Sequence, residues 1–151
     1  MTKYLLIFFF PLLLSAQSTF FFALGKVESN NNDLAIGDSS RAISRYQIWH
    51  VYYLDAKEFD KSINFSYSSL TNQNNAEKVM LAYFRRYEST ALKNKDWETL
   101  ARLHNGGPNW RKKKDKTDFY WKKVKKELDV MIISGKVGAW TKPKFGASTV
   151  A

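Results

Sequence analysis

Apolar residues recur at helical spacing along much of the chain, and this pattern limits the fold more than any other feature. Between residues 75 and 93 they mark one face of a helix: Ala76, Val79, Met80, Tyr83, Phe84 and Tyr87. The same spacing follows Asp96, a residue type suited to cap a helix. No convincing alternation of the kind that builds strands is present. The sequence therefore predicts a mainly α fold.

Further helices are expected on either side of this region. One runs from about Phe20 to Ser29, and another from Tyr46 to about residue 56. The helix that follows Asp96 ends at Asn105-Gly106-Gly107-Pro108, and Thr117 is expected to cap a last helix. The polar residues 57–74 indicate a long loop. About five helices result.

A turn signal interrupts the helices near the N-terminal third of the chain. Gly37-Asp38-Ser39-Ser40 is typical of a tight turn, so residues 33–44 are expected to form a loop or a small β-hairpin. With that hairpin, the fold class is α+β with helices predominating.

Composition excludes several kinds of site. The 151 residues contain no cysteine, which excludes disulfide staples, thiol nucleophiles and cysteine-ligated metals. With only two histidines, a multi-histidine metal site is improbable, and no metal or cofactor is expected. The net charge of +10 favours contact with polyanions, such as acidic cell-wall polymers, anionic lipid or nucleic acid.

The first 18 residues have the organisation of a secretory signal peptide. Lys3 supplies the positive charge, Tyr4–Leu14 the apolar run, and Ser15-Ala16-Gln17-Ser18 the small-residue cleavage site. A signal anchor extending to Leu24 is the alternative, since 20 or so apolar residues can span a bilayer. We favour cleavage near Ser18, and thus a secreted or periplasmic protein. Residues 19–133 then form the domain, and residues 134–151 a flexible tail.

Two carboxylates are the strongest candidates for chemistry. The chain has no G-x-S-x-G, P-loop or G-x-G-x-x-G motif. Glu28 ends a very apolar segment, where desolvation favours the protonated form that a general acid requires. Asp38 sits in a polar turn that favours its ionised form. Such contrasting carboxyls suit glycoside hydrolysis, although a Glu near a helix end is more often a solvated surface group.

Several blocks of sequence resemble the invertebrate-type (destabilase-like) lysozymes. The most specific is A-R-L-H-N-G-G-P at 101–108, followed by Y-W-K-K-V at 120–124. Upstream lie Val27-Glu28-Ser29, Gly37-Asp38 and the pair of blocks Tyr46-Gln47-Ile48 and Tyr52-Tyr53-Leu54-Asp55-Ala56. Residues 79–87 resemble a further block of that family. The order agrees, and the blocks cover roughly residues 23–125.

This resemblance implies a lysozyme-like fold in which Glu28 matches the family's general acid. Asp38 matches its second carboxylate, as nucleophile or stabiliser of the glycosyl cation. The implied substrate is the β-1,4 bond between N-acetylmuramic acid and N-acetylglucosamine in peptidoglycan. The chain departs from the family in lacking disulfides and in carrying Arg41 and Arg45, where the family has a glycine-containing turn.

The other candidate residues are assigned to substrate binding. Gln47 is expected to line the floor of the cleft, with a capping or surface role as the alternative. Tyr46 is expected to border a sugar subsite, with simple packing as the alternative. His104 and Asn105 end a helix beside Gly106 and Gly107, whose exposed backbone groups could bind a saccharide amide. His104 is interpreted as an orienting hydrogen-bond partner.

Two tryptophans were also considered for sugar stacking. Trp110 and Trp121 are large enough to pack on a sugar face, but the helical spacing of Trp121 with Val124 is more typical of a core residue.

The leading hypothesis is a secreted, monomeric muramidase that binds peptidoglycan and is attracted to anionic wall polymers. A lytic transglycosylase is a close variant, and a degenerate lysozyme that binds peptidoglycan without cleaving it is the main alternative. An isopeptidase would need a Ser/Lys pair that spacing does not identify. Nucleic-acid binding is not expected, since no reading motif accompanies the basic charge.

Overall fold

The computed structural model describes residues 10–133, with side chains from residue 16 onward. The helices within this range are α1 (Phe10–Ser29), α2 (His50–Phe59), α3 (Gln73–Lys93), α4 (Trp97–Gly106) and α5 (Lys114–Ile133). Two 3₁₀ helices, η1 (Tyr67–Thr71) and η2 (Trp110–Lys113), lie between them. Three two-residue strands, β1 (Ile36–Gly37), β2 (Ala42–Ile43) and β3 (Ile48–Trp49), complete the fold. The prediction of a mainly α fold with a small β-hairpin is confirmed.

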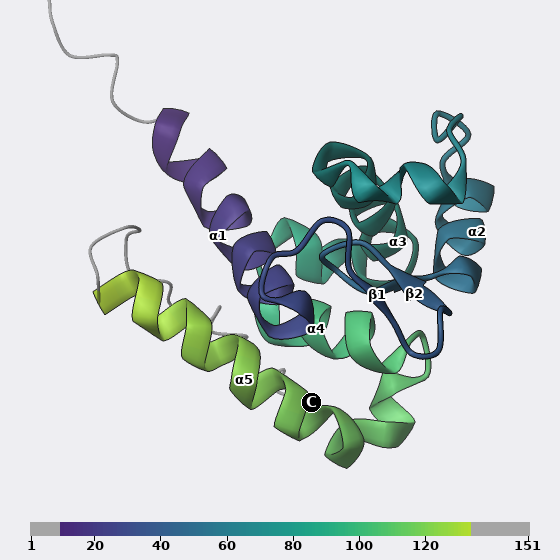
Figure 1. Ribbon diagram of the computed structural model, residues 1–151. Helices are drawn as coiled ribbons and strands as arrows, with labels where there is room; N and C mark the ends of the chain where they lie inside the picture. The colour runs from purple at the N-terminus through teal and green to yellow at the C-terminus, as the bar shows by residue number, and fades with distance from the viewer. Residues whose placement is uncertain (1–9, 134–151) are drawn as a thin grey trace, which may run out of the picture.

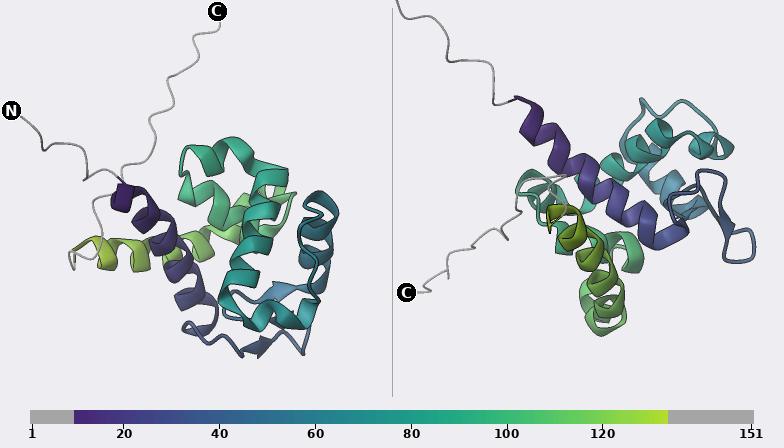
Figure 2. Two further views of the ribbon diagram at one scale, coloured as in Figure 1. Left: turned by 90° about the horizontal axis from the view of Figure 1, so that it is seen from above. Right: turned by 60° about the vertical axis from the view of Figure 1, so that its left-hand side comes forward.

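The helices pack as pairs around one core. α1 contacts α5, α5 contacts α4, α4 contacts α3, and α3 contacts α2 (Figure 1). The strands form an antiparallel sheet in the order β1-β2-β3, with Ile36 opposite Ile43 and Ala42 opposite Trp49. The chain enters this sheet directly after α1 and leaves it into α2, so the sheet lies beyond the C-terminal end of α1 (Figure 2).

Stacked aromatic rings join α1 to α3 and α4 in the core. Phe20 of α1 stacks on Trp97 of α4, with ring centroids 4.6 Å apart and an interplanar angle of 16°. Phe21 lies parallel to Phe84 of α3 at 6.5 Å. All four side chains are almost completely buried. Burial of each such ring contributes roughly 1.5–3 kcal/mol, which explains how three helices are held without a covalent link.

The helix expected from Tyr46 begins later, at His50. Ile48 and Trp49 pair with β2 instead, and the left-handed backbone of Gln47 (φ 49°) separates this strand from the segment before it. The dense apolar residues at 46–54 therefore mark a strand followed by a helix. Periodicity alone does not distinguish this arrangement from one buried helix.

The expected cap at Thr117 is also wrong. α5 begins at Lys114, and Thr117 is a buried residue of its first turn. Its Oγ1 donates to the carbonyl of Lys114 at 2.9 Å and accepts from Arg102 at 3.0 Å. Thr117 thus links α5 to α4 and does not cap α5.

Arg102 is the centre of that link. Its side chain is 3% exposed and binds Glu98 of α4 at 3.0 Å and Asp118 of α5 at 2.9 Å. It also donates to the carbonyl of Lys114 at 3.1 Å. Because every nitrogen of the guanidinium has a partner, the buried charge is compensated, and the C-terminal half of α4 is fixed against α5.

The predicted capping residue of α4 is confirmed. The carboxylate of Asp96 accepts from the backbone N–H of Thr99 at 3.3 Å and from its hydroxyl at 2.8 Å. α4 therefore starts where the sequence predicts, and its last turn carries His104, Asn105 and Gly106.

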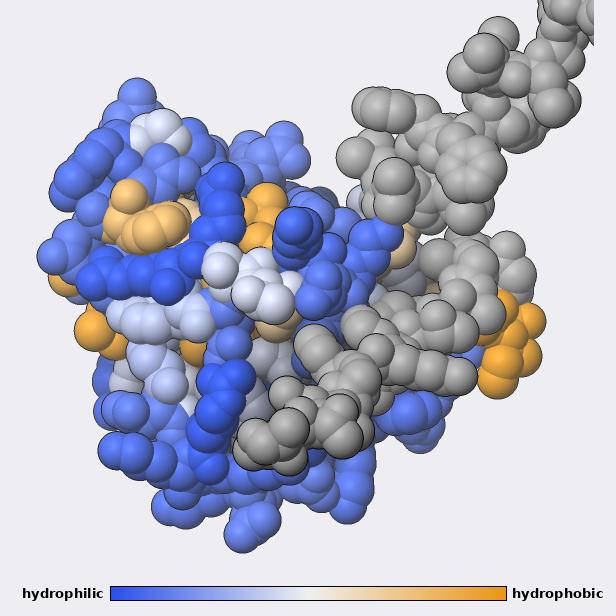
Figure 3. Space-filling model, turned by 180° about the vertical axis from the view of Figure 1, so that it is seen from behind, coloured by the Kyte–Doolittle hydropathy of each residue, from blue (hydrophilic) through white to orange (hydrophobic). Residues whose placement is uncertain are grey.

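The face opposite to that of Figure 1 is largely hydrophilic, with apolar residues in separate small groups (Figure 3). No helix in the described part of the chain is long and apolar enough to cross a membrane. The predicted signal peptide lies partly outside the described residues; positions 10–18 form the first half of α1. The predicted tail from residue 134 lies outside them completely.

Candidate active site

A cleft of about 850 Å³ opens where the C-terminal end of α1, the sheet, α2 and the end of α4 meet. Its volume is in the range of small-molecule sites. The residues that line it come from α1, the segment with the sheet, α2, α3, the end of α4 with the turn after it, and η2. They are Glu28, Asp38, Ala42, Gln47, Trp49, Val51, Tyr52, Asp55, Tyr83, His104, Asn105, Gly106, Gly107, Pro108 and Lys113.

Glu28 lies in the last turn of α1, and its side chain is 19% exposed. It therefore reaches the cleft without being open to bulk solvent. Its Oε1 is 3.5 Å from Nε2 of His104. The structure thus brings together a carboxyl and the H-N-G-G-P block, which are 76 positions apart in the sequence (104 − 28).

His104 is held in place on one side only. Its ring is 3% exposed, and Nε2 lies 3.0 Å from the carbonyl oxygen of Tyr46. Nδ1 has no hydrogen-bond partner among the described residues. The contact with a carbonyl oxygen favours the tautomer with the proton on Nε2, which leaves Nδ1 as an acceptor.

Two buried tyrosine hydroxyls, those of Tyr52 and Tyr120, form no hydrogen bond within the described residues. Burial raises the pKa of Tyr120 well above its ordinary range, and the nearby Glu28 carboxylate adds to this effect. Burial likewise raises the pKa of Tyr52, which lines the cleft and whose ring stacks on Tyr83 with centroids 3.6 Å apart. The Tyr120 hydroxyl is therefore a close polar neighbour of the Glu28 carboxylate.

Asp38 lies across the sheet end of the cleft in a strained turn. Asp38, Ser39 and Ser40 all have left-handed backbones, with φ of 49°, 54° and 69°. Such a conformation is unfavourable for residues with a β-carbon. Arg41 holds the turn: its Nη2 is 2.7 Å from Oδ1 of Asp38, and its Nε donates to the Asp38 carbonyl at 3.1 Å.

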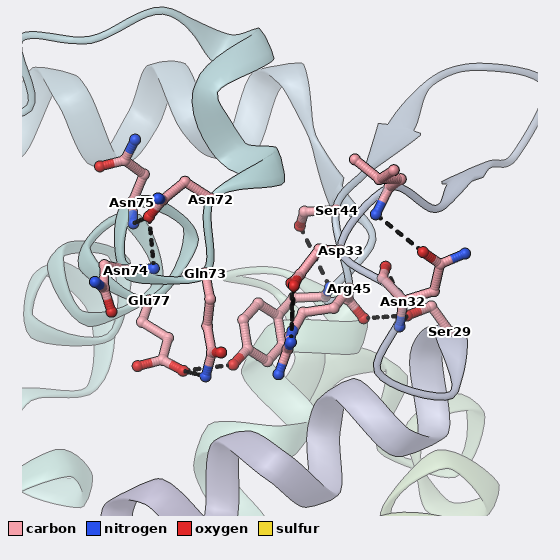
Figure 4. Close-up of polar contacts among 12 residues, drawn as sticks. Ser29, Asn32, Asp33, Ser44, Arg45, Asn72, Gln73, Asn74, Asn75 and Glu77 are labelled. Atoms are coloured by element: carbon pink, nitrogen blue, oxygen red, sulfur yellow. Dashed lines mark hydrogen bonds and ion pairs between the residues drawn. The ribbon is translucent and has the colours of Figure 1, made fainter.

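The segment that carries Asp38 and Gln47 is anchored at both ends (Figure 4). Arg45 binds the carboxylate of Asp33 through two nitrogens at 2.6 and 2.9 Å. Ser29, the last residue of α1, donates to the carbonyl of Arg45 at 2.9 Å. Of the two arginines that depart from the family, Arg45 is thus structural, and only Arg41 contacts residues that line the cleft.

Tyr46 does not border the cleft. Its side chain is completely buried, and its hydroxyl donates to Glu77 of α3 at 2.6 Å. The expectation that it contacts a sugar is therefore wrong, because no part of the ring is accessible. Its backbone is nevertheless important, since the carbonyl positions His104. Gln47, by contrast, lines the cleft, and its amide donates to the carbonyl of Ser44 at 3.0 Å.

Glycine is needed at both positions that end α4, for a different structural reason at each. A β-carbon at Gly106 would lie 2.7 Å from the side chain of Thr117, so the close packing of α4 on α5 requires glycine. Gly107 has a φ of 71°, a left-handed backbone that ends the helix. Both glycines and Asn105 line the cleft.

Trp110 and Trp121 are both buried, so neither ring presents a face to a sugar. Trp110 is 6% exposed, and its Nε1 donates to Glu88 at 3.2 Å. Trp121 is 7% exposed and belongs to the core, as its helical spacing indicates.

The structure adds two residues that sequence reasoning missed. Asp55 of α2 is a third carboxylate in the cleft, bound by Arg86 at 3.2 Å and by the hydroxyl of Tyr87. Trp49 also lines the cleft and is 42% exposed. Asp55 lies in a sequence block that matches the family, so it could have been proposed from the sequence. Nothing in the sequence indicates that Trp49 reaches the cleft, because its exposure depends on the pairing of β3 with β2.

The described residues contain no group of three or more potential ligands arranged to hold a metal ion. The cleft itself presents carboxylates, an imidazole and a tyrosine hydroxyl.

A comparison with known protein families gives one match, to the family named Destabilase, over residues 18–127. The match covers the sheet, the cleft and every helix except the ends of α1 and α5. The chain belongs to the destabilase family. This is the family of invertebrate-type lysozymes, so the resemblance inferred from the sequence blocks is confirmed. Comparison with curated proteins gives no match.

Membership of the destabilase family makes the chain a lysozyme-like protein of the glycoside hydrolase kind with a polysaccharide substrate. The chain contains no cysteine.

Proposed function

We propose that this protein is a muramidase, which hydrolyses the β-1,4 bond between N-acetylmuramic acid and N-acetylglucosamine in peptidoglycan. The observation that carries the proposal is the position of Glu28. It is a largely shielded carboxyl in the wall of a sugar-sized cleft, within 3.5 Å of the histidine of the H-N-G-G-P block.

Glu28 is the proton donor in this mechanism. It protonates the oxygen of the glycosidic bond as that bond breaks, and the sugar that remains develops the charge of a glycosyl cation. Nε2 of His104 lies 3.5 Å from the Glu28 carboxylate, and the Tyr120 hydroxyl lies close to it. These two groups are therefore the polar neighbours of the proton donor at the end of α1.

Asp38 supplies the negative charge that the glycosyl cation needs, by stabilising it or by forming a bond to it. Its place in the lining of the same cleft supports this role. A water molecule then adds to the anomeric carbon, and its proton returns to Glu28. Gln47, Asn105, Gly106 and Gly107 offer the polar side-chain and backbone groups that position the sugar amides.

The alternative within the same site is a lytic transglycosylase, which uses one acidic residue and forms an anhydro sugar without water. The second alternative is a protein that binds peptidoglycan without cleaving it. The ion pair between Asp38 and Arg41 supports this second alternative, because a carboxylate whose charge stays neutralised would not stabilise a glycosyl cation.

We also propose that the protein is exported and that the chain is cleaved near Ser18. The family match begins at residue 18, one residue before the predicted mature domain. The first apolar residues after that point, including Phe20, Phe21 and Leu24, are buried in the core. Cleavage would thus keep the part of α1 that the domain needs.

Product analysis tests the proposed reaction. The mature protein is incubated with a Gram-positive wall suspension, and turbidity and soluble muropeptides are measured. Hydrolysis predicts clearing and products with free reducing ends. Anhydro products, lighter by one water or about 18 Da, would indicate the transglycosylase instead. Binding to the insoluble wall with no soluble product would overturn the enzymatic proposal.

A further inference from the structure

Arg41 places a positive charge at the rim of the cleft. Its guanidinium contacts two residues that line the cleft: it pairs with Asp38 at 2.7 Å and lies 4.8 Å from the centre of the Trp49 ring. Its side chain is nevertheless 61% exposed. The cation is therefore fixed in position while a large part of it faces solvent.

The two contacts make this charge better ordered than an ordinary surface arginine. An aromatic face and a carboxylate each restrict the guanidinium plane, so less conformational freedom remains to be lost when a ligand binds. The contacts to Asp38 use Nε and Nη2. A guanidinium carries five N–H donors, and it binds carboxylates with favourable planar geometry.

A second cation lines the same cleft from the side of η2. Lys113 is exposed there, next to the turn formed by Gly107 and Pro108. A cleft with cations at its edge and carboxylates in its interior fits a polymer whose backbone is neutral where the bond breaks and which has acidic groups at its sides.

We propose that Arg41 is a specificity-determining residue that binds a carboxylate of the glycan, so that the cleft selects carboxylated chains over neutral N-acetylglucosamine polymers. In peptidoglycan that carboxylate belongs to the lactyl group or to its peptide. This inference rests on the proposed function, since it names the substrate class of the same cleft.

Binding measurements separate the role of Arg41 from catalysis. The full mature chain with Glu28→Gln is titrated calorimetrically with two tetrasaccharides. One alternates N-acetylglucosamine with N-acetylmuramic acid and has free lactyl carboxylates; the other contains only N-acetylglucosamine. Arg41→Gln is expected to weaken binding of the carboxylated tetramer by about two- to fivefold, the range that loss of an exposed ion pair covers. Binding of the neutral tetramer should stay unchanged.

Two further variants make the result specific. Arg85→Gln, on α3, removes an equal charge from an exposed ion pair with Asp60, and it should alter neither affinity. Arg41→Lys keeps the charge but loses the planar geometry, and should fall between the original chain and Arg41→Gln. Added salt should weaken binding of the carboxylated tetramer more when Arg41 is present.

Two outcomes would count against the proposal in different ways. Equal effects of Arg41→Gln on both tetramers, or no effect on either, would overturn the role of Arg41 and leave the muramidase proposal in place. If neither tetramer binds and the unaltered protein releases no muropeptides, the proposed function fails, and the role of Arg41 fails with it.

Discussion

Nε2 of His104 lies 3.5 Å from Oε1 of Glu28, although the two residues lie in the last turns of α4 and α1, 76 positions apart in the sequence. The same nitrogen lies 3.0 Å from the carbonyl of Tyr46. One imidazole therefore connects α1, α4 and the segment before β3. These contacts place the histidine of the H-N-G-G-P block beside the candidate proton donor, at the wall of the cleft.

The two other carboxylates of the cleft should respond differently to removal of their charge. Asp38→Asn should lower kcat by about 10²-fold or more, because Asp38 is assigned to the developing cation. Asp55→Asn should retain most of kcat, since Arg86 and Tyr87 already engage that carboxylate. Initial rates of muropeptide release measure both. The opposite order would assign the second carboxylate to Asp55.

Tyr120→Phe should lower the rate of muropeptide release without unfolding the protein. The Tyr120 hydroxyl is buried close to the Glu28 carboxylate, and a phenylalanine ring keeps the packing. Loss of the hydroxyl should reduce kcat/KM severalfold, because a polar neighbour of the candidate proton donor is removed. Initial rates and thermal unfolding measure the two effects. An unchanged rate would show that the hydroxyl has no part in the reaction.

Much of the fold could be predicted because helical periodicity is a local property. The stripe at 76–87 and the cap at Asp96 correspond to α3 and to the start of α4. The boundaries that differ depend on contacts made far away. Ile48 and Trp49 become a strand through pairing with β2, and Thr117 enters the helix because it binds Arg102. Neither partner is visible in a local pattern.

The candidate site could also be predicted only in part. The motif blocks identify Glu28, Asp38, Gln47 and residues 104–107, and all of them line one cleft. Tyr46 was assigned with them but is buried, since a motif does not show which of two neighbouring side chains faces inward. The exposure of Trp49 and the pairing of Arg41 with Asp38 depend on the strained turn, so they needed the structure.

Alkaline pH should destabilise the protein through its buried tyrosines. The folded chain holds the pKa of Tyr52 and Tyr120 well above the value of 10.0 that applies to an unburied tyrosine. Their contribution to stability is complete below pH 10. Above it, the unfolded chain releases protons that the folded chain keeps, so the free energy of unfolding falls by up to about 1.4 kcal/mol per pH unit for each tyrosine.

Urea unfolding between pH 8 and pH 11 measures this slope. Tyr120→Phe removes one of the tyrosines whose pKa is raised, and the fall in the free energy of unfolding above pH 10 should become less steep. An unchanged slope would mean that the Tyr120 hydroxyl is accessible to solvent in the folded protein.

Arg102→Met should destabilise the protein by about 2–4 kcal/mol. The substitution leaves Glu98 and Asp118 without their shared cation and breaks the bonds to Thr117 and the Lys114 carbonyl. Arg85→Met, which removes an exposed ion pair, should cost less than about 1 kcal/mol. Thermal unfolding monitored by circular dichroism compares the two. Equal losses would contradict the role of Arg102 in joining α4 to α5.

The rate of peptidoglycan cleavage by Glu28→Gln is the most direct test of the account. With Glu28 as the proton donor, kcat/KM should fall by about 10²- to 10⁴-fold, while the variant keeps its melting temperature and binds the glycan. Glu58→Gln, which alters an exposed carboxylate paired with Arg86, is the matched control and should retain full activity. If Glu28→Gln released reducing ends as fast as the unaltered protein, the assignment of this cleft as a glycosidase site would be contradicted.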